Sequence, residues 1–271
     1  MDYRTFEPHA DLEAIVKCFW TLEAPKELMP GKQRIVPDGC MEMIFHYGDL
    51  YKQYAESGTF IAQPKCFVFG QITSPLDIEP AGITGIFAVR FYPGSFAPFA
   101  AIPVQGMENR AVALTEVFGE EGLLLENEVL NARTTAGRIA ATEAFLLKKL
   151  SSPVSVDRIA RSTVEMIMQL KGQVSVDELS EQLQVNRRQL ERRFSLATGL
   201  GPKQLSKMIR LQAALKKLLG NQSASLTAVA YESDYYDQAH FIKDFKEFTG
   251  MSPKMFYADN LKMSALFSGT E

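Results

Sequence analysis

A twelve-residue pattern that occurs twice constrains the fold of this chain more than any other feature. Residues 194–205 read FSLATGLGPKQL and residues 245–256 read FKEFTGMSPKMF, with Phe, Thr, Gly, Pro and Lys in the same register. Glycine is common just after the end of a helix, and proline is common in the first turn of the next helix. The repeat therefore predicts a duplicated unit in which one helix ends at the glycine and another begins at the proline.

Helix-start signals precede the first copy. Ser175 followed by Glu178 fits a capping box, and Asn186 followed by Gln189 fits a second capping pattern. We therefore expect a short helix, a tight break and a second helix, after which a long helix covers 202–220. This is the helix-turn-helix layout, in which the second helix enters the major groove of DNA.

The same series then repeats. Ser225 is expected to cap a short helix, a break is expected at 234–236, and a second helix is expected to run to Gly250 before Ser252 and Pro253 open a last one. At about 100° per residue, each second helix has one apolar face and one basic or small face. The predicted buried residues are Leu190, Phe194 and Ala197 in the first copy, and Phe241, Phe245 and Phe248 in the second.

The opposite faces carry the candidate DNA-binding residues. Basic side chains there would offset phosphate charge or hydrogen-bond to guanine, although a basic face opposite an apolar stripe is also typical of an ordinary solvated helix. Two copies with matching ends favour the DNA interpretation. The candidates are Asn186, Arg187, Arg188, Glu191, Arg192 and Ser195 in the first unit, and Gln238, Ala239, Lys243 and Lys246 in the second.

At these residues the sequence resembles the AraC/XylS family of transcription regulators. The resemblance covers 175–258 and is most specific in A-x-x-x-x-Y-x-D-Q-A-H-F-x-x-x-F-K-x-x-x-G-x-S-P, from Ala230 to Pro253. It implies two helix-turn-helix units held rigidly by the long helix, which read successive major-groove segments about one turn apart. The positions that match the base-reading residues of the family are Arg188, Glu191 and Arg192, and then Gln238, Ala239 and Lys243.

The second unit departs from the family pattern at three positions. Asp234 stands where the family has Gly, and Tyr236 stands where a Ser caps the helix, so the cap is weakened or shifted to Asp237. Ala239 can touch a thymine methyl group but cannot form a hydrogen bond. We therefore expect the second unit to read less sequence than the first, and the more basic first unit to contribute more affinity.

The N-terminal half has the pattern of strands. Short runs rich in aromatic and β-branched residues at 41–48, 51–62, 67–72 and 85–92 are separated by Gly, Pro, Asp and Ser. They predict a small β-barrel or cupin-like domain, followed after about residue 111 by helices that include 134–150 and 155–170. The chain is thus predicted to be a multidomain α+β protein, with a β-rich domain over 1–152 and an all-α DNA-binding domain over 153–271, whose units span about 175–200 and 225–251. Pro153 marks the boundary.

Three N-terminal segments extend the family resemblance. RIVPDGCMEMIFHYGD (34–49), FVFGQIT (67–73) and AVRFYPGSF (88–96) are similar to the amino-terminal domain of one subgroup of these regulators. Such domains commonly bind a small molecule or dimerise the protein. The resemblance therefore implies control by a small-molecule effector or by dimerisation, without naming the effector.

Four ionisable residues in this half are candidate ligand-binding residues: Asp38, Glu42, His46 and Arg90. Glu42 and His46 project to the opposite side of their strand from Met43 and Phe45. If that side faces the interior, they line a pocket in which Arg90 binds an anion. The alternative is a solvent-facing strand, with Asp38 fixing a turn and Arg90 paired with an acid. Trp20, the only tryptophan, fits the core or an interface better than ligand stacking.

Composition limits the partners. Net charge is −3, but residues 175–258 hold 12 basic and 9 acidic residues, so the basic excess is C-terminal. No stretch is apolar enough to span a membrane, and we expect a cytoplasmic protein without a cofactor. Three cysteines without C-x-x-C and three histidines predict neither a disulfide framework nor a metal site. The expected partners are double-stranded DNA, a small-molecule effector, a second copy of the chain, and RNA polymerase if the protein activates. The apolar stripe of the 134–150 helix is expected to pack within its own domain, and a dimer seam is the alternative.

Two other functions stay open. An enzyme or repair-type sensor fused to a DNA-binding module would need a reactive thiol, and Cys40 is the only candidate. Its acidic neighbours Asp38 and Glu42 would raise the pKa of the thiol, which disfavours a nucleophile. A protein-interaction adaptor without DNA binding is the other alternative, and the retained Arg188 and Lys243 argue against it. We therefore expect a regulator that is not an enzyme.

Overall fold

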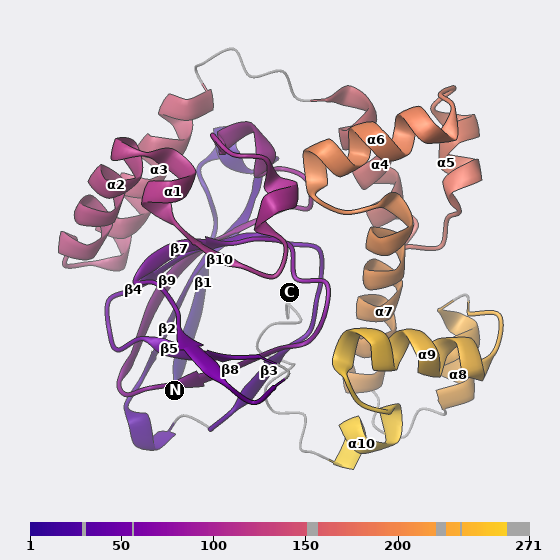
Figure 1. Ribbon diagram of the computed structural model, residues 1–271, viewed down its shortest axis with the longest axis horizontal. Coiled ribbons are helices and arrows are strands. Elements are labelled where there is room, and N and C mark those ends of the chain that lie inside the picture. Colours follow the sequence, from indigo (N-terminus) through magenta and orange to yellow (C-terminus); the bar gives the residue numbers. More distant parts are fainter. Residues whose placement is uncertain (29–30, 56, 151–156, 221–225, 234, 259–271) are drawn as a thin grey trace.

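The computed structural model describes residues 1–28, 31–55, 57–150, 157–220, 226–233 and 235–258. A β-rich N-terminal part stands beside a helical C-terminal part, and a long helix runs through the middle of the latter (Figure 1). The fold class predicted from the sequence is confirmed in this respect. The predicted boundary residue, Pro153, lies outside the described residues, as do Ser225 and Asp234.

Two antiparallel sheets make up the N-terminal part. The first has the strand order β1 (Asp2–Phe6), β2 (Val16–Ala24), β9 (Thr84–Phe91), β4 (Glu42–His46), β7 (Cys66–Phe69) and β10 (Ala111–Ala113). The second has the order β3 (Gln33–Ile35), β8 (Leu76–Pro80), β5 (Tyr51–Tyr54) and β6 (Phe60–Ala62). Short 3-10 helices lie between the strands: η1 (Ala10–Leu12), η2 (Lys26–Leu28), η3 (Ala97–Phe99) and η4 (Val104–Met107).

Alternation along the strands gives the first sheet two different faces. In β4, Met43 and Phe45 belong to the main N-terminal core, whereas Ile44 packs with a second cluster around Trp20 and Tyr51. Tyr51 belongs to the second sheet, so this second cluster lies between the two sheets. One face of the first sheet is therefore a conventional core, and the other face looks toward the second sheet.

Three helices cover the first of these faces: α1 (Leu114–Phe118), α2 (Glu120–Asn131) and α3 (Thr135–Leu150). Leu146 of α3 is fully buried, and Ile139, Phe145 and Leu150 pack against the same core. The helix expected at 134–150 is therefore present, and its apolar stripe packs within its own domain.

The C-terminal part consists of α4 (Arg158–Gln169), α5 (Val176–Gln182), α6 (Arg187–Thr198), α7 (Pro202–Gly220), α8 (Leu226–Glu232), α9 (Gln238–Thr249) and α10 (Pro253–Ala258). The capping box at Ser175 and Glu178 is formed, and α7 and α10 begin at the expected prolines. The pairs α5–α6 and α8–α9 are the two predicted helix-turn-helix units. Figure 1 shows α6 and α9 near opposite ends of α7.

The repeated Thr-Gly forms the same helix end twice. The Thr198 hydroxyl donates to the Phe194 carbonyl at 2.9 Å and accepts from the Leu200 N–H at 3.0 Å. Thr249 repeats these bonds with the Phe245 carbonyl at 2.6 Å and the Met251 N–H at 3.3 Å. Each following glycine is left-handed, with φ of 78° at Gly199 and 73° at Gly250. The pattern is written twice because it ends two equivalent helices.

The strand predictions were correct in kind but incomplete. The run at 51–62 forms two strands, β5 and β6, because a turn falls at 57–58. The predicted runs did not include β1, β2, β3, β8 or β10. Most of these strands are short or mix polar with apolar residues, so they lack the aromatic-rich signal of β4 and β9.

Candidate DNA-reading face and ligand pocket

The two candidate recognition helices begin with matching caps. The Asn186 side chain accepts a hydrogen bond from the Gln189 N–H at 2.9 Å at the start of α6. At the start of α9 the Asp237 carboxylate accepts from the His240 N–H at 2.7 Å. Of the two outcomes expected for Tyr236, the cap has therefore shifted to Asp237.

The buried faces of these helices agree with the predicted periodicity. Leu190 and Phe194 in α6, and Phe241, Phe245 and Phe248 in α9, are fully buried in one C-terminal core. Ala197 is half-buried. The apolar stripes thus fix both helices on α7 and leave their opposite faces toward solvent.

The candidate DNA-binding residues lie on these outward faces. Glu191 and Ser195 are half-buried, and the other eight are exposed: Asn186, Arg187, Arg188, Arg192, Gln238, Ala239, Lys243 and Lys246. Within the described parts of the chain, Arg188, Arg192, Lys243 and Lys246 form no ion pair. Their charges are therefore free to meet phosphate or base edges.

Arg187 differs from its neighbours because it is engaged within the protein. Its guanidinium pairs with Glu191 at 3.0 Å and with Asp177 of α5 at 3.2 Å. The pairing joins the two helices of the first unit. Arg187 thus holds α6 to α5 through Asp177 and is itself held by Glu191.

Ion pairs brace both units against the rest of the C-terminal part. Lys207 of α7 contacts the buried Asp244 of α9 at 3.0 Å and Glu247 at 2.7 Å. Arg193 of α6 contacts Asp157, the N-cap of α4, at 2.7 Å. These contacts, together with the shared core, hold α6 and α9 in one fixed relation, which two-segment reading of a duplex requires.

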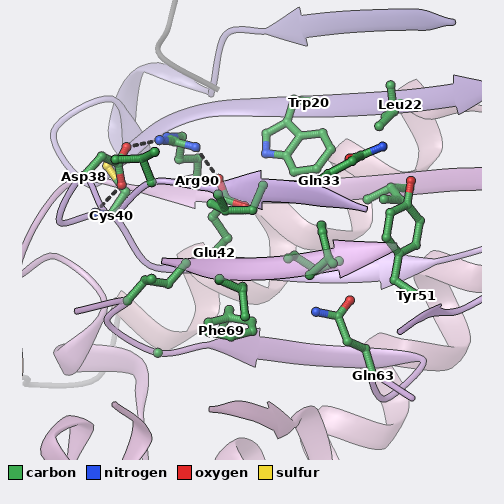
Figure 2. A pocket seen from close by; sticks show the side chains of 18 of the residues that line it. Trp20, Leu22, Gln33, Asp38, Cys40, Glu42, Tyr51, Gln63, Phe69 and Arg90 are labelled. Carbon is green, nitrogen blue, oxygen red and sulfur yellow. Dashed lines mark hydrogen bonds and ion pairs between the residues drawn. The ribbon is translucent and has the colours of Figure 1, made fainter. Parts of the chain in front are cut away.

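A cavity of about 80 Å³ lies between the two sheets of the N-terminal part. Its walls come from β2, β9, β4 and β7 on one side and from β3, β8 and β5 on the other. Figure 2 shows Asp38, Cys40, Glu42 and Arg90 gathered at one end, whereas Tyr51 and Gln63 lie toward the other. The structure thus brings all four predicted ligand-binding residues, including His46, to one pocket.

Arg90 is held between two carboxylates in this pocket. Its guanidinium donates to Asp38 and to Glu42 (dashed lines in Figure 2), and Asp38 also accepts from the Cys40 N–H at 3.0 Å. Burial alone would lower the pKa of Arg90, but Asp38 and the other acids raise it, so the side chain stays charged. Burial raises the pKa of Glu42 against the lowering effect of Arg90.

The two alternatives for these residues each hold in part. Asp38 does fix a turn and Arg90 does pair with acids, yet the polar face of β4 looks into the cavity and not into solvent. A ligand-binding role for the four residues stays a prediction. The expectation that Arg90 would bind an anion needs revision, because both of its terminal nitrogens already contact carboxylates.

The far end of the pocket is polar but uncharged. His46 is 1% exposed, stacks on Tyr51 and lies tilted against Phe67, and burial lowers its pKa to about 4. Gln63 opposes that shift, although neither ring nitrogen has a hydrogen-bond partner of good geometry among the described residues. His46 is therefore neutral near pH 7.

Several lining residues were not predicted from the sequence. Gln33, Tyr51 and Gln63 come from segments that pair only through long-range contacts, and Trp20 was expected in the core or at an interface. The alternation of Trp20 and Leu22 with Phe19 along β2 is the signal that could have placed Trp20 on the pocket side.

Cys40 has the properties of an inert thiol. Burial, with Asp38 beside it, raises its pKa to about 12, in the direction expected from the sequence. Nucleophilic and redox cysteines have lowered pKa values. Among the described residues no three His, Cys, Asp or Glu side chains are grouped to hold a metal ion, and no described helix is long and apolar enough to cross a membrane.

Two family models match separate parts of the chain. Residues 4–113 match a family described as a domain of unknown function (DUF6597), and residues 179–258 match a family described as a helix-turn-helix domain. No match is found among the curated proteins.

The solved structures that are similar to this chain have low sequence identity to it. ToxT from Vibrio cholerae is 14% identical, with 93% of this chain and 99% of ToxT covered and a TM-score of 0.47. The AraC-like transcriptional activator CuxR is 13% identical, with 86% and 90% covered and a TM-score of 0.32. The C-terminal domain of AraT, a response regulator from Geobacillus stearothermophilus, is 23% identical over 38% of this chain and 87% of that domain, with a TM-score of 0.36. Similarities at this level assign neither ligand nor site residues.

The helix-turn-helix match falls on the two units whose reading faces are described above. Together they define a DNA-binding transcription regulator. The chain carries at its C-terminal end a helix-turn-helix domain of the AraC type, as the resemblance at Ala230 to Pro253 implied.

Proposed function

We propose that this regulator reads DNA with α6 and α9, and that a small molecule in the N-terminal pocket changes how the DNA-binding part is held. The coupling between the pocket and the DNA-binding part is inferred from the position of the segment 33–40. One side of this segment lines the pocket, and the other side contacts the helices of the C-terminal part.

Arg188 and Arg192 are proposed to make the main base and phosphate contacts of the first unit. Gln238 and Lys243 are proposed to do so in the second unit, where Ala239 offers only a methyl group. Asn186, Ser195 and Lys246 would contact the backbone, which positions a protein without selecting sequence. Support comes from the exposure of these residues, apart from the half-buried Ser195, and from the unpaired charges of the four basic ones among the described residues.

The segment 33–40 supports the coupling through contacts on both of its sides. Gln33, Val36, Asp38 and Cys40 line the pocket. On the other side the Pro37 carbonyl accepts a hydrogen bond of 2.8 Å from Gln212 of α7. A ligand that displaces the pocket side would therefore also displace the side that α7 contacts.

Gly39 packs closely against α7 in this contact. A β-carbon at Gly39 would come within 2.4 Å of a Leu205 methyl group, and its φ of 79° is left-handed. Its carbonyl accepts a hydrogen bond of 3.1 Å from Gln71. Close packing of this kind transmits displacements, because packed interfaces shift between arrangements instead of deforming freely.

The remaining parts of the proposal follow from the same function. The domains are taken as 1–152 and 153–271, and access to DNA would place the protein in the cytoplasm. We propose no catalytic role, because the raised pKa of Cys40 disfavours the one thiol considered. Homodimerisation, and contact with RNA polymerase if the protein activates, stay predictions.

The experiment that tests the coupling changes the domain contact without touching the reading face. DNA affinity is compared between the wild type and Gln212→Ala, with Gln169→Ala as the control because Gln169 is an exposed residue of α4, outside both helix-turn-helix units. We expect Gln212→Ala to change the dissociation constant several-fold, since a lost hydrogen bond of about 1 kcal/mol corresponds to roughly a fivefold effect. Equal affinities in all three proteins would overturn the coupling while leaving DNA binding intact.

A further inference from the structure

The charged end of the pocket already contains its own anions. Arg90 is the one lysine or arginine among the described residues that line the cavity, and Asp38 and Glu42 both contact it. Resting on the proposed function, we propose that the pocket takes a small organic cation, an amine with a compact apolar body, and excludes carboxylates and other anions.

The first step of the argument is the charge of this cluster. The side chains of Arg90, Asp38 and Glu42 are 12%, 20% and 16% exposed, so water screens them poorly. One guanidinium against two carboxylates leaves one negative charge in excess when both acids are ionised. A buried charge without a partner is strongly unfavourable.

A cationic ligand would supply the missing positive charge. An ammonium group donates three hydrogen bonds, and bonds to carboxylates are roughly twice as strong as neutral ones. An anion would have to separate Arg90 from its two acids and then lie beside them. The excess negative charge of the cluster therefore attracts cations and repels anions.

The walls of the cavity define the rest of the ligand. Leu22, Ile44, Ile78 and Ile86 make the middle of the pocket apolar. Trp20 stands beside Arg90 and Glu42 in Figure 2, and indole faces attract cations. The volume of about 80 Å³ is several times what a single water needs, which suits a small molecule with few heavy atoms.

Two buried polar groups at the uncharged end give independent support for a ligand. Gln33 is 3% exposed and His46 is 1% exposed, and both line the cavity. The Gln33 amide nitrogen finds no hydrogen-bond partner of good geometry among the described residues, and the only side chain there that approaches the His46 ring nitrogens for hydrogen bonding is Gln63, at poor geometry. Buried polar groups are seldom left unpaired in proteins, so a polar group on the far end of a ligand would meet them.

The test uses three probes of one shape and different charge: benzylamine, benzyl alcohol and benzoate. Binding to the full chain at pH 7.5 is followed by the fluorescence of Trp20, the only tryptophan, and by calorimetry. We expect benzylamine to bind at least tenfold more tightly than benzoate, with benzyl alcohol between them. Benzoate binding as tightly as benzylamine, or no binding by any of the three probes, would overturn the proposal.

A variant tests whether the preference for the amine comes from the charges of Arg90, Asp38 and Glu42. Glu42→Gln removes the excess charge and should abolish the advantage of benzylamine over benzyl alcohol. Glu116→Gln, an exposed glutamate outside the pocket, is the matched control and should keep that advantage. A Glu42→Gln protein that still prefers the amine would contradict the charge argument.

A pH series on the wild type needs no variant and decides the matter if Glu42→Gln does not fold. Protons compete with the amine for Glu42, so benzylamine affinity should fall as the pH is lowered, whereas benzyl alcohol affinity should change little. The titratable groups that act on Glu42 are Arg90 of β9, Asp38 and Cys40 before β4, Cys18 of β2 and Tyr3 of β1. An amine affinity that does not depend on pH would contradict the proposal.

Failure of the cation-binding proposal and failure of the proposed function give different results. DNA affinity of the same preparations is measured alongside ligand binding. Normal DNA binding without a preference for the amine overturns the ligand class alone, whereas loss of both effects would also remove the support for the regulator.

Discussion

Arg34 and Thr249 join the two halves of the molecule across 215 residues of sequence. The Arg34 guanidinium donates to the Thr249 carbonyl at 3.2 Å and also pairs with Asp77 of β8 at 2.7 Å. Thr249 is the last residue of α9, and Gly250 follows it in a left-handed conformation. The end of α9, the second candidate recognition helix, therefore rests on the sheet that forms one wall of the candidate ligand pocket.

Gly250 should tolerate substitution poorly. Gly250→Ala would place a β-carbon 2.9 Å from the Arg34 guanidinium at a φ of 73°. We expect a loss of about 1–2 kcal/mol in the free energy of unfolding from the left-handed conformation alone, measured by urea denaturation. Gly201→Ala is the control, because nothing lies within 4 Å of its added carbon. Equal losses in the two variants would contradict the account of this junction.

Stability should depend on pH through His46. Its pKa is about 4 in the folded protein and about 6.5 in the unfolded chain. The unfolded state therefore binds more protons between these values. The contribution of neutral His46 to the free energy of unfolding is therefore complete above pH 6.5. It is lost as the pH falls toward 4, and the total loss is on the order of 3 kcal/mol.

The variant His46→Phe isolates this effect. A phenyl ring suits the aromatic neighbours Tyr51 and Phe67 and carries no charge at any pH. We expect the slope of unfolding free energy against pH between 6.5 and 4 to flatten in His46→Phe and to remain in His9→Gln, which changes an exposed histidine. A slope that is the same in all three proteins would rule out His46 as its source.

Local signals in the sequence predicted the helical part well, because caps and helix ends depend on near neighbours. Asn186, Gly199 and Pro202 act within four residues of themselves, and each does what its type favours. The Thr-Gly repeat belongs to the same class, since its hydrogen bonds reach only to neighbouring turns.

The pocket was only partly predictable, because its geometry depends on long-range pairing. Alternation put Glu42 and His46 on one face of β4, but it could not tell whether that face looks at solvent or at another sheet. Gln33 and Tyr51 reach the cavity through the pairing of β3 and β5 with β8. The contact between Arg34 and Thr249 has no local signal at all.

The first helix-turn-helix unit should contribute more to DNA affinity than the second. Arg192 and Lys243 are both exposed and unpaired among the described residues, but the first unit offers two guanidinium groups, at Arg188 and Arg192, where the second has Ala239 and Lys243. We expect Arg192→Ala to weaken binding to a specific site by about 1–3 kcal/mol and Lys243→Ala to weaken it less. Fluorescence anisotropy at fixed salt measures both, and a larger effect of Lys243→Ala would reverse the assignment.

Arg161→Ala provides the control for charge. Arg161 is an exposed residue of α4 that pairs with Glu165 and lies outside both recognition helices. Its removal should leave affinity for the site nearly unchanged. A loss as large as that of Arg192→Ala would indicate general attraction to DNA instead of reading by α6.

The most direct test of the central claim is a selection of genomic fragments by the full-length protein at near-physiological salt, beside the double variant Arg192→Ala/Lys243→Ala. The account predicts one enriched motif with two contacted segments about a helical turn apart, which the variant no longer selects. The same motif enriched equally by both proteins would contradict the claim that these two helices read DNA.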